Sequence, residues 1–214
     1  MNKELKQVRI CLGRFQPFTL GHLKMALYKE LNGPDEEQLK SLREQPDLDI
    51  IKNQKTILLV ISTSKDKIDE RHPFEDKLMK KEFDIIQQQY DEIEKIIYIK
   101  SADICYWGEI LKQNGYQASV WLCGSDSYSY YKKMAMNVPK YEIQNRDNRD
   151  CKDAYTKSFY VENIERNEND FISSISGTKV RETLLNNDKD LFISMMPKET
   201  EILFDNFRQA IINI

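Results

Sequence analysis

The chain has 214 residues, a formal net charge of −3, and 40% hydrophobic and 31% charged side chains. This length suffices for a buried core, and the mildly acidic balance argues against a general nucleic-acid binder, which needs a basic face to neutralise phosphates. No apolar run approaches the roughly 20 residues that cross a bilayer, and the first residues lack the apolar core of a signal peptide. We therefore expect a cytoplasmic protein that binds neither membranes nor nucleic acids.

The four cysteines form no CxxC pair, and neither histidine is spaced as a metal partner for them. Cys11 and Cys123 lie within apolar runs, where a thiol acts as a small hydrophobe. This pattern favours free thiols in a reducing compartment over a structural zinc site or a disulfide framework.

Apolar runs typical of strands alternate with helix-like segments along the chain. Residues 8–12 form a short apolar run that ends at Gly13, and residues 56–62 form a continuous one, as expected for strands covered on both faces. Pro73 is favourably placed to begin a long helix. The order predicts a doubly wound parallel α/β sheet in a single domain spanning residues 1–214, with a charged surface insertion at 33–55 and closing helices at 178–214. The predicted strands are 8–12, 56–62, 95–99, 118–123, 139–143 and 158–164, and the predicted helices are 21–31, 73–90, 107–113, 127–136, 178–185 and 198–212.

Ligands of such sheets bind at the carboxyl ends of the strands, where the strand order reverses. The segment after the first predicted strand is GRFQPFTLGH. Gly13 and Gly21 allow close approach to a ligand, and a helix starting near Gly21 directs free N–H groups toward a phosphate. His22 is expected in the first turn of that helix, and Arg14 adds a fixed charge. The alternative interpretation is an ordinary loop in which Thr19 caps the helix.

A second segment with phosphate-binding character is SISGTKVRETLL. Its hydroxyl groups and backbone donors at a helix start, followed by an arginine one turn later, would form a polyphosphate clamp. The residues concerned are Ser176, Gly177, Thr178 and Arg181. A capped surface helix is the alternative interpretation.

The two segments resemble the (H/T)xGH and ISxTxxR motifs of the nucleotidyltransferase superfamily, whose members transfer a nucleoside monophosphate from ATP or CTP. The string GRFQPF is most similar to the archaeal-type nicotinamide mononucleotide adenylyltransferases, although Thr19 stands where that subgroup usually has histidine. The resemblance extends from Val8 to about Leu185 and implies a Rossmann-like fold. It also implies that Mg²⁺ accompanies the ATP with few ligands from the protein, so no metal-binding residues are predicted.

The resemblance implies roles for individual residues. His22 would donate to the α-phosphate of ATP, Thr19 would orient a neighbouring phosphate, and Arg181 would hold the leaving pyrophosphate. A glycine-acidic turn after the fourth strand would meet the adenosine, with an ordinary turn as the alternative. The implied ATP-binding residues are Gly13, Arg14, Phe15, Gly21, His22, Gly124, Asp126, Ser176, Gly177, Thr178 and Arg181.

The implied acceptor site draws on the segments after the second and third predicted strands. Trp107 lies in a stretch similar to the one that carries a nicotinamide-stacking tryptophan, and an aromatic face attracts a pyridinium cation. Packing in the core is the alternative for Trp107, and a proline-started helix is the alternative for the segment beginning at Arg71. The expected acceptor-binding residues are Gln16, Arg71, Asp103 and Trp107.

The resemblance thus predicts an enzyme that transfers AMP from ATP to nicotinamide mononucleotide, yielding NAD and pyrophosphate. The same transfer to another phosphorylated acceptor such as phosphopantetheine, or from CTP, is the first alternative. A catalytically silent nucleotide sensor is the second, because a fold alone does not define a function. A homo-oligomer is compatible with the sequence.

Overall fold

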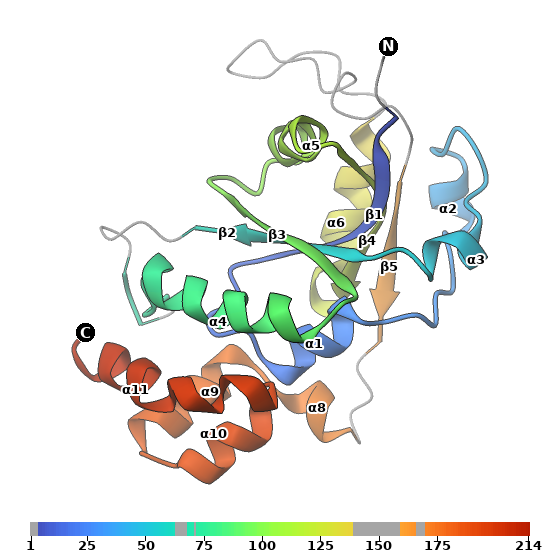
Figure 1. Ribbon diagram of the computed structural model, residues 1–214. Coiled ribbons are helices and arrows are strands. Elements are labelled where there is room, and N and C mark those ends of the chain that lie inside the picture. The colour runs from blue at the N-terminus through green and yellow to red at the C-terminus, as the bar shows by residue number, and fades with distance from the viewer. Residues whose placement is uncertain (1–3, 63–67, 71, 139–158, 166–169) are drawn as a thin grey trace.

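Five parallel strands form one sheet in the order β3-β2-β1-β4-β5, as Figure 1 shows. The computed structural model describes residues 4–62, 68–70, 72–138, 159–165 and 170–214. The predicted strand at 139–143 lies outside these residues. The strands are β1 (Lys6–Gly13), β2 (Thr56–Ile61), β3 (Ile93–Ile99), β4 (Tyr116–Gly124) and β5 (Tyr160–Ile164).

The strand order reverses between β1 and β4. The chain builds outward from β1 through β2 to β3, then returns to place β4 on the free side of β1. This arrangement confirms the predicted doubly wound, Rossmann-like α/β fold. It also places the topological switch point, where ligands of such sheets bind, at the carboxyl ends of β1 and β4.

Helices cover both faces of the sheet. Side chains alternate along each strand, so Cys11 and Leu58 face one buried cluster while Ile10 and Leu59 face the other. This explains why the strands are continuous apolar runs in the sequence. In the described part of the chain, no helix is both long and apolar enough to span a membrane. The first face carries α1 (Leu20–Ala26), α4 (Asp76–Gln89) and the C-terminal elements α8 (Phe171–Ser174), α9 (Gly177–Leu185), α10 (Lys189–Met195), η3 (Lys198–Leu203) and α11 (Phe204–Ile212), and the second carries α5 (Ile104–Gln113) and α6 (Ser125–Asn137).

Hydrogen bonds join the insertion at 33–55 to β5. It contains the short helices α2 (Glu36–Leu39) and α3 (Leu48–Ile51). The buried amide of Gln38 accepts from the Val161 N–H at 2.8 Å and donates to the Val161 carbonyl at 3.2 Å. The insertion was expected to be a solvated surface feature, and this expectation was wrong for Gln38, because its side chain bonds to the backbone of the edge strand.

The cysteines differ from the expectation of free thiols. Cys105 is disulfide-bonded, whereas Cys11 and Cys123 are buried free thiols. Sequence spacing fails here because a disulfide requires close approach of two side chains in the fold, whatever their separation along the chain.

Candidate functional site

A cavity of about 220 Å³ opens at the topological switch point. Leu12 and Gly13 contribute from the carboxyl end of β1, and Leu122, Cys123 and Gly124 contribute from that of β4. The cavity brings together eight of the predicted site residues: Gly13, Arg14, Phe15, Thr19, Gly21, His22, Gly124 and Asp126.

A capping box at the start of α1 orients His22. The Thr19 hydroxyl accepts from the His22 backbone N–H at 3.5 Å, and Nδ1 of His22 accepts from the Thr19 backbone N–H at 3.0 Å. A ring nitrogen that accepts carries no proton, so the proton of the neutral imidazole lies on Nε2, which is therefore a donor. Thr19 is therefore the N-cap of α1, and the residue is only 1% exposed.

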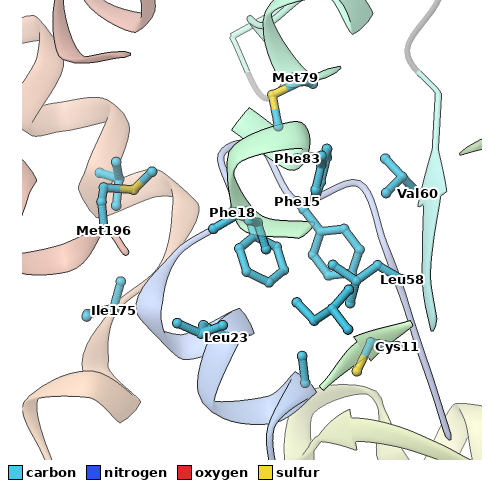
Figure 2. Close-up of a cluster of buried hydrophobic side chains, with 14 of the residues drawn as sticks. Cys11, Phe15, Phe18, Leu23, Leu58, Val60, Met79, Phe83, Ile175 and Met196 are labelled. Carbon is cyan, nitrogen blue, oxygen red and sulfur yellow. The ribbon is translucent and has the colours of Figure 1, made fainter. Parts of the chain in front are cut away.

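The loop before α1 is shaped by a buried aromatic cluster. The ring of Phe15 lies 5.1 Å from that of His22 and 5.5 Å from that of Phe18, and Figure 2 shows Phe15 and Phe18 beside Phe83 of α4. Phe15 adopts a φ of 50°, a left-handed conformation that is costly for a bulky residue. A Cβ at Gly13 would lie 2.8 Å from the Phe15 ring, so glycine is required there to make room for that ring.

The second of the two segments predicted to bind phosphate contacts the first. Nη1 of Arg181 donates to the Gln16 carbonyl at 2.9 Å, and Nη2 donates to the Thr178 hydroxyl at 3.1 Å. A Cβ at Gly177 would lie 3.0 Å from the same Gln16 carbonyl oxygen, so this close approach depends on glycine. The two motifs, separated by about 150 residues in the sequence, therefore meet in the structure.

The start of α9 adjoins the cavity and is not part of its wall. The Ser176 hydroxyl caps α9 by accepting from the Lys179 N–H at 3.2 Å. Ser176 and the three other predicted residues of α9 are absent from the cavity lining, whereas the preceding residue, Ile175, lines it. Burial lowers the pKa of Arg181, although the carboxylates of Asp69 and Glu182 act in the opposite direction. A ligand in the cavity would have to extend past Ile175 to reach this guanidinium.

Two predicted acceptor residues have structural roles instead. The buried side chain of Gln16 donates to the Phe74 carbonyl at 3.1 Å and accepts from the Phe74 N–H at 3.0 Å, tying the loop to the segment before α4. Asp103 caps α5 by accepting from the Tyr106 N–H at 2.8 Å. Neither Gln16 nor Asp103 lines the cavity, and their assignment to an acceptor site stays a prediction.

Trp107 is a core residue. Its side chain is 0% exposed, and its ring packs edge-on against Trp121 at a centroid distance of 5.4 Å. A ring with no exposed surface fits the alternative interpretation, packing in the core, and the stacking role stays a prediction. Arg71, the remaining predicted acceptor residue, lies outside the described residues.

Several cavity residues were not found by sequence reasoning. Ile164 ends β5, the neighbour of β4, and Glu165 follows it, so the rule that sites form at strand ends could have identified both. Lys24 forms an ion pair with Asp170, which caps α8. The capping residue Asp170 is the sequence signal for α8, a helix of only four residues. The further lining residues are Met25, Ser127, Tyr131, Ile172, Ser173 and Ile175.

The cavity lining carries both signs of charge, with the basic side chains Arg14 and Lys24 and the acidic side chains Asp126 and Glu165. Arg14, Lys24 and the Nε2–H group of His22 supply donors. Burial raises the pKa of the Cys123 thiol to about 12, so this thiol is protonated at neutral pH and is a poor nucleophile. Among the described residues, no group of three or more His, Cys, Asp or Glu side chains could hold a metal ion.

The fold is similar to that of several solved structures. Two structures of the Plasmodium falciparum nicotinic acid mononucleotide adenylyltransferase, complexed with APC and with NaAD, have TM-scores of 0.54 and 0.55. In both, sequence identity is 17%, and the match covers 96% of this chain and 98% of that chain. A Vibrio parahaemolyticus protein assigned as a nicotinate-nucleotide adenylyltransferase matches at a TM-score of 0.50 and 14% identity, over 96% of each chain. At such identities the likeness establishes a common fold.

No protein-family model matches the sequence, and no match was found among curated proteins.

Proposed function

We propose that this protein is a nucleotidyltransferase that transfers AMP from ATP to nicotinamide mononucleotide, or to its nicotinic acid form, with release of pyrophosphate. The observation that carries the proposal is the contact between Arg181 and the Gln16 carbonyl, 2.9 Å long. It joins the GRFQPFTLGH and SISGTKVR segments beside a cavity at the switch point of the sheet. The fold shared with nicotinic acid mononucleotide adenylyltransferases supports the same class of reaction and an acceptor with a pyridine ring.

The reaction needs no covalent intermediate on the protein. A phosphate oxygen of the mononucleotide attacks the α-phosphorus of ATP, and the bond to the leaving pyrophosphate breaks. The protein then has to align the two phosphates and stabilise the charge that develops in the transition state. Nε2–H of His22 is suited to donate to the α-phosphate, because Nδ1 is committed to the Thr19 N–H.

The remaining cations would act on the triphosphate. Arg14 and Lys24 line the cavity, and Arg181, with the hydroxyl groups of Ser176 and Thr178, lies beyond Ile175 at the start of α9. In this proposal the adenosine occupies the cavity near Gly124 and the pyrophosphate extends toward Arg181. Magnesium enters on the triphosphate and offsets its charge.

The presence of threonine at position 19 is compatible with this mechanism. Threonine is a favourable N-cap residue, and here it forms one half of the box that holds His22. Its proposed task is therefore to hold the imidazole in place.

The test is pyrophosphate release in the presence of ATP and magnesium, measured with a panel of acceptors. The panel comprises nicotinamide mononucleotide, nicotinic acid mononucleotide, phosphopantetheine, choline phosphate and glycerol phosphate. We expect release with a pyridine mononucleotide, accompanied by formation of the corresponding dinucleotide. Release with another acceptor alone would retain the class of reaction and overturn the acceptor. ATP binding without release in any reaction would contradict an enzyme and favour a sensor.

A further inference from the structure

Buried ionisable side chains hold α1 at both ends. At its start, both carboxyl oxygens of Glu82, on α4, accept from the backbone N–H of Phe18 at 3.2 and 3.1 Å. At its end, Arg9 of β1 donates to the carbonyls of Ala26 and Tyr28. Glu82 and Arg9 are both 0% exposed. The helix that carries His22 is thus fixed by groups outside the capping box itself.

Glu82 occupies an unusual environment for an acid. It lies at the position before Phe83, whose ring contacts Phe15 at 6.1 Å and Phe18 at 5.7 Å, in the cluster that Figure 2 shows. Within the described residues, no cation pairs with Glu82. Burying a carboxyl group is costly unless it forms hydrogen bonds, and its bond here is to the Phe18 N–H. Burial also raises the pKa of Glu82 well above its ordinary value, and the bond from the Phe18 N–H acts in the opposite direction.

Two consecutive backbone donors connect Glu82 to His22. The N–H of Phe18 is held by Glu82, and the next N–H along the chain, that of Thr19, donates to Nδ1 of His22 at 3.0 Å. The Phe18 ring also lies 5.7 Å from the imidazole ring. Fixing the backbone at Phe18 therefore directs the Thr19 N–H toward Nδ1 of His22. It also fixes the position of the Phe18 ring beside the imidazole.

We propose that Glu82 is a positioning residue for His22: its hold on the Phe18 N–H directs the Thr19 N–H to Nδ1 and so keeps the imidazole proton on Nε2. The effect on catalysis rests on the proposed function, whereas the effect on the imidazole does not. A purely structural role for Glu82 would lower stability and leave the tautomer of His22 unchanged.

Nitrogen NMR of the imidazole rings tests the tautomer directly. The chain has only two histidines, His22 and His72, so the spectrum is simple, and a His72→Asn variant assigns it. In the wild-type protein we expect Nδ1 of His22 at the position of an unprotonated nitrogen and Nε2 at that of a protonated one. Glu82→Gln keeps an oxygen that can accept from Phe18 and should retain this spectrum.

Glu82→Leu removes the acceptor and should shift both His22 nitrogens toward the average of the two tautomers. If this variant does not fold, Glu82→Asp asks the same question, because its carboxyl group is one methylene too short to reach the Phe18 N–H. A wild-type His22 spectrum in a folded Glu82→Leu or Glu82→Asp variant would overturn the proposal.

Kinetics provide the second readout. With an acceptor from the panel above that supports pyrophosphate release, Glu82→Leu or Glu82→Asp should lower kcat tenfold or more while the Kd for ATP changes less than twofold, and Glu82→Gln should retain at least half of the wild-type kcat. An unchanged kcat, or an equal loss of kcat and ATP affinity, would overturn the role. If the wild-type protein releases no pyrophosphate with any acceptor, the proposed function fails, and the NMR result still decides whether Glu82 positions His22.

Discussion

Two regions along the same edge of the sheet have very different roles. At the switch point, the segments after β1 and β4 line a cavity with Gly13, His22, Gly124 and Asp126. At the outer strand β3, the following segment caps a helix with Asp103 and buries Trp107 in the core. Both regions follow the carboxyl end of a strand, and only the first lies where the strand order reverses. A position after a strand is therefore insufficient for a site, because the gap between diverging connections is what opens a cavity.

The largest expected effect lies in the outer region. Trp107→Ala should lower the free energy of unfolding by about 3–5 kcal/mol, because it removes a large, fully buried aromatic side chain. Urea denaturation measures this change. Trp107→Phe should keep the affinity for a mononucleotide within experimental error, and a selective loss of that affinity would contradict the core assignment.

The next effect lies at the switch point. His22→Ala should lower kcat by about two orders of magnitude, equivalent to about 2.7 kcal/mol of transition-state stabilisation. The Kd for ATP should change far less, since the proposed donor acts mainly on charge that develops in the transition state. Steady-state pyrophosphate release and ATP titration measure the two quantities. A kcat close to that of the wild-type protein would remove His22 from the mechanism.

A smaller effect is expected at the N-cap of α5, the helix that follows β3. Asp103→Ala should cost about 1 kcal/mol of stability through loss of the bond to the Tyr106 N–H. Thermal unfolding measures this cost. The affinity for the acceptor should not change, and a clear loss would return Asp103 to the binding site.

The last expected effect is on the pH dependence of stability. The pKa of Glu82 is raised by burial in the folded protein, so the native state binds this proton more tightly than the unfolded state does. The stabilisation that comes from this proton is complete below about pH 4.3, the pKa of a glutamate in the unfolded chain. It is lost as the pH rises toward the pKa of Glu82 in the folded protein. The glutamine of the Glu82→Gln variant is uncharged at every pH. Compared with this variant, the melting temperature of the wild-type protein should fall as the pH rises above about 5. A constant difference between the two proteins would show that Glu82 does not titrate in this way.

The sheet was predictable because both of its faces are buried. Continuous apolar runs such as 56–62 have few other interpretations, and the predictions for the five described strands lie close to the observed bounds. The short helices were harder to predict from the sequence. The helix expected at 198–212 is a 3₁₀ segment, Lys198–Leu203, followed by α11, and α10 was missed, although Asp188 provides a capping signal for it.

The site was predictable where strand ends coincide with the switch point. The burial of Trp107 was also open to prediction: Ile104, Trp107 and Leu111 have the spacing of a buried helical face, and all three are buried. The bonds from Glu82 to Phe18 and from Arg181 to Gln16 could not be predicted, since they join residues 64 and 165 positions apart.

The amide of Gln38 has a consequence for how the protein behaves in solution. Among the described strands β5 is at the end of the sheet, and an exposed edge strand can pair with a strand of another chain. Gln38 occupies both the donor and the acceptor of Val161, in the place that a further strand would take. The inserted segment therefore blocks the pairing of a further strand at Val161 and disfavours edge-to-edge aggregation.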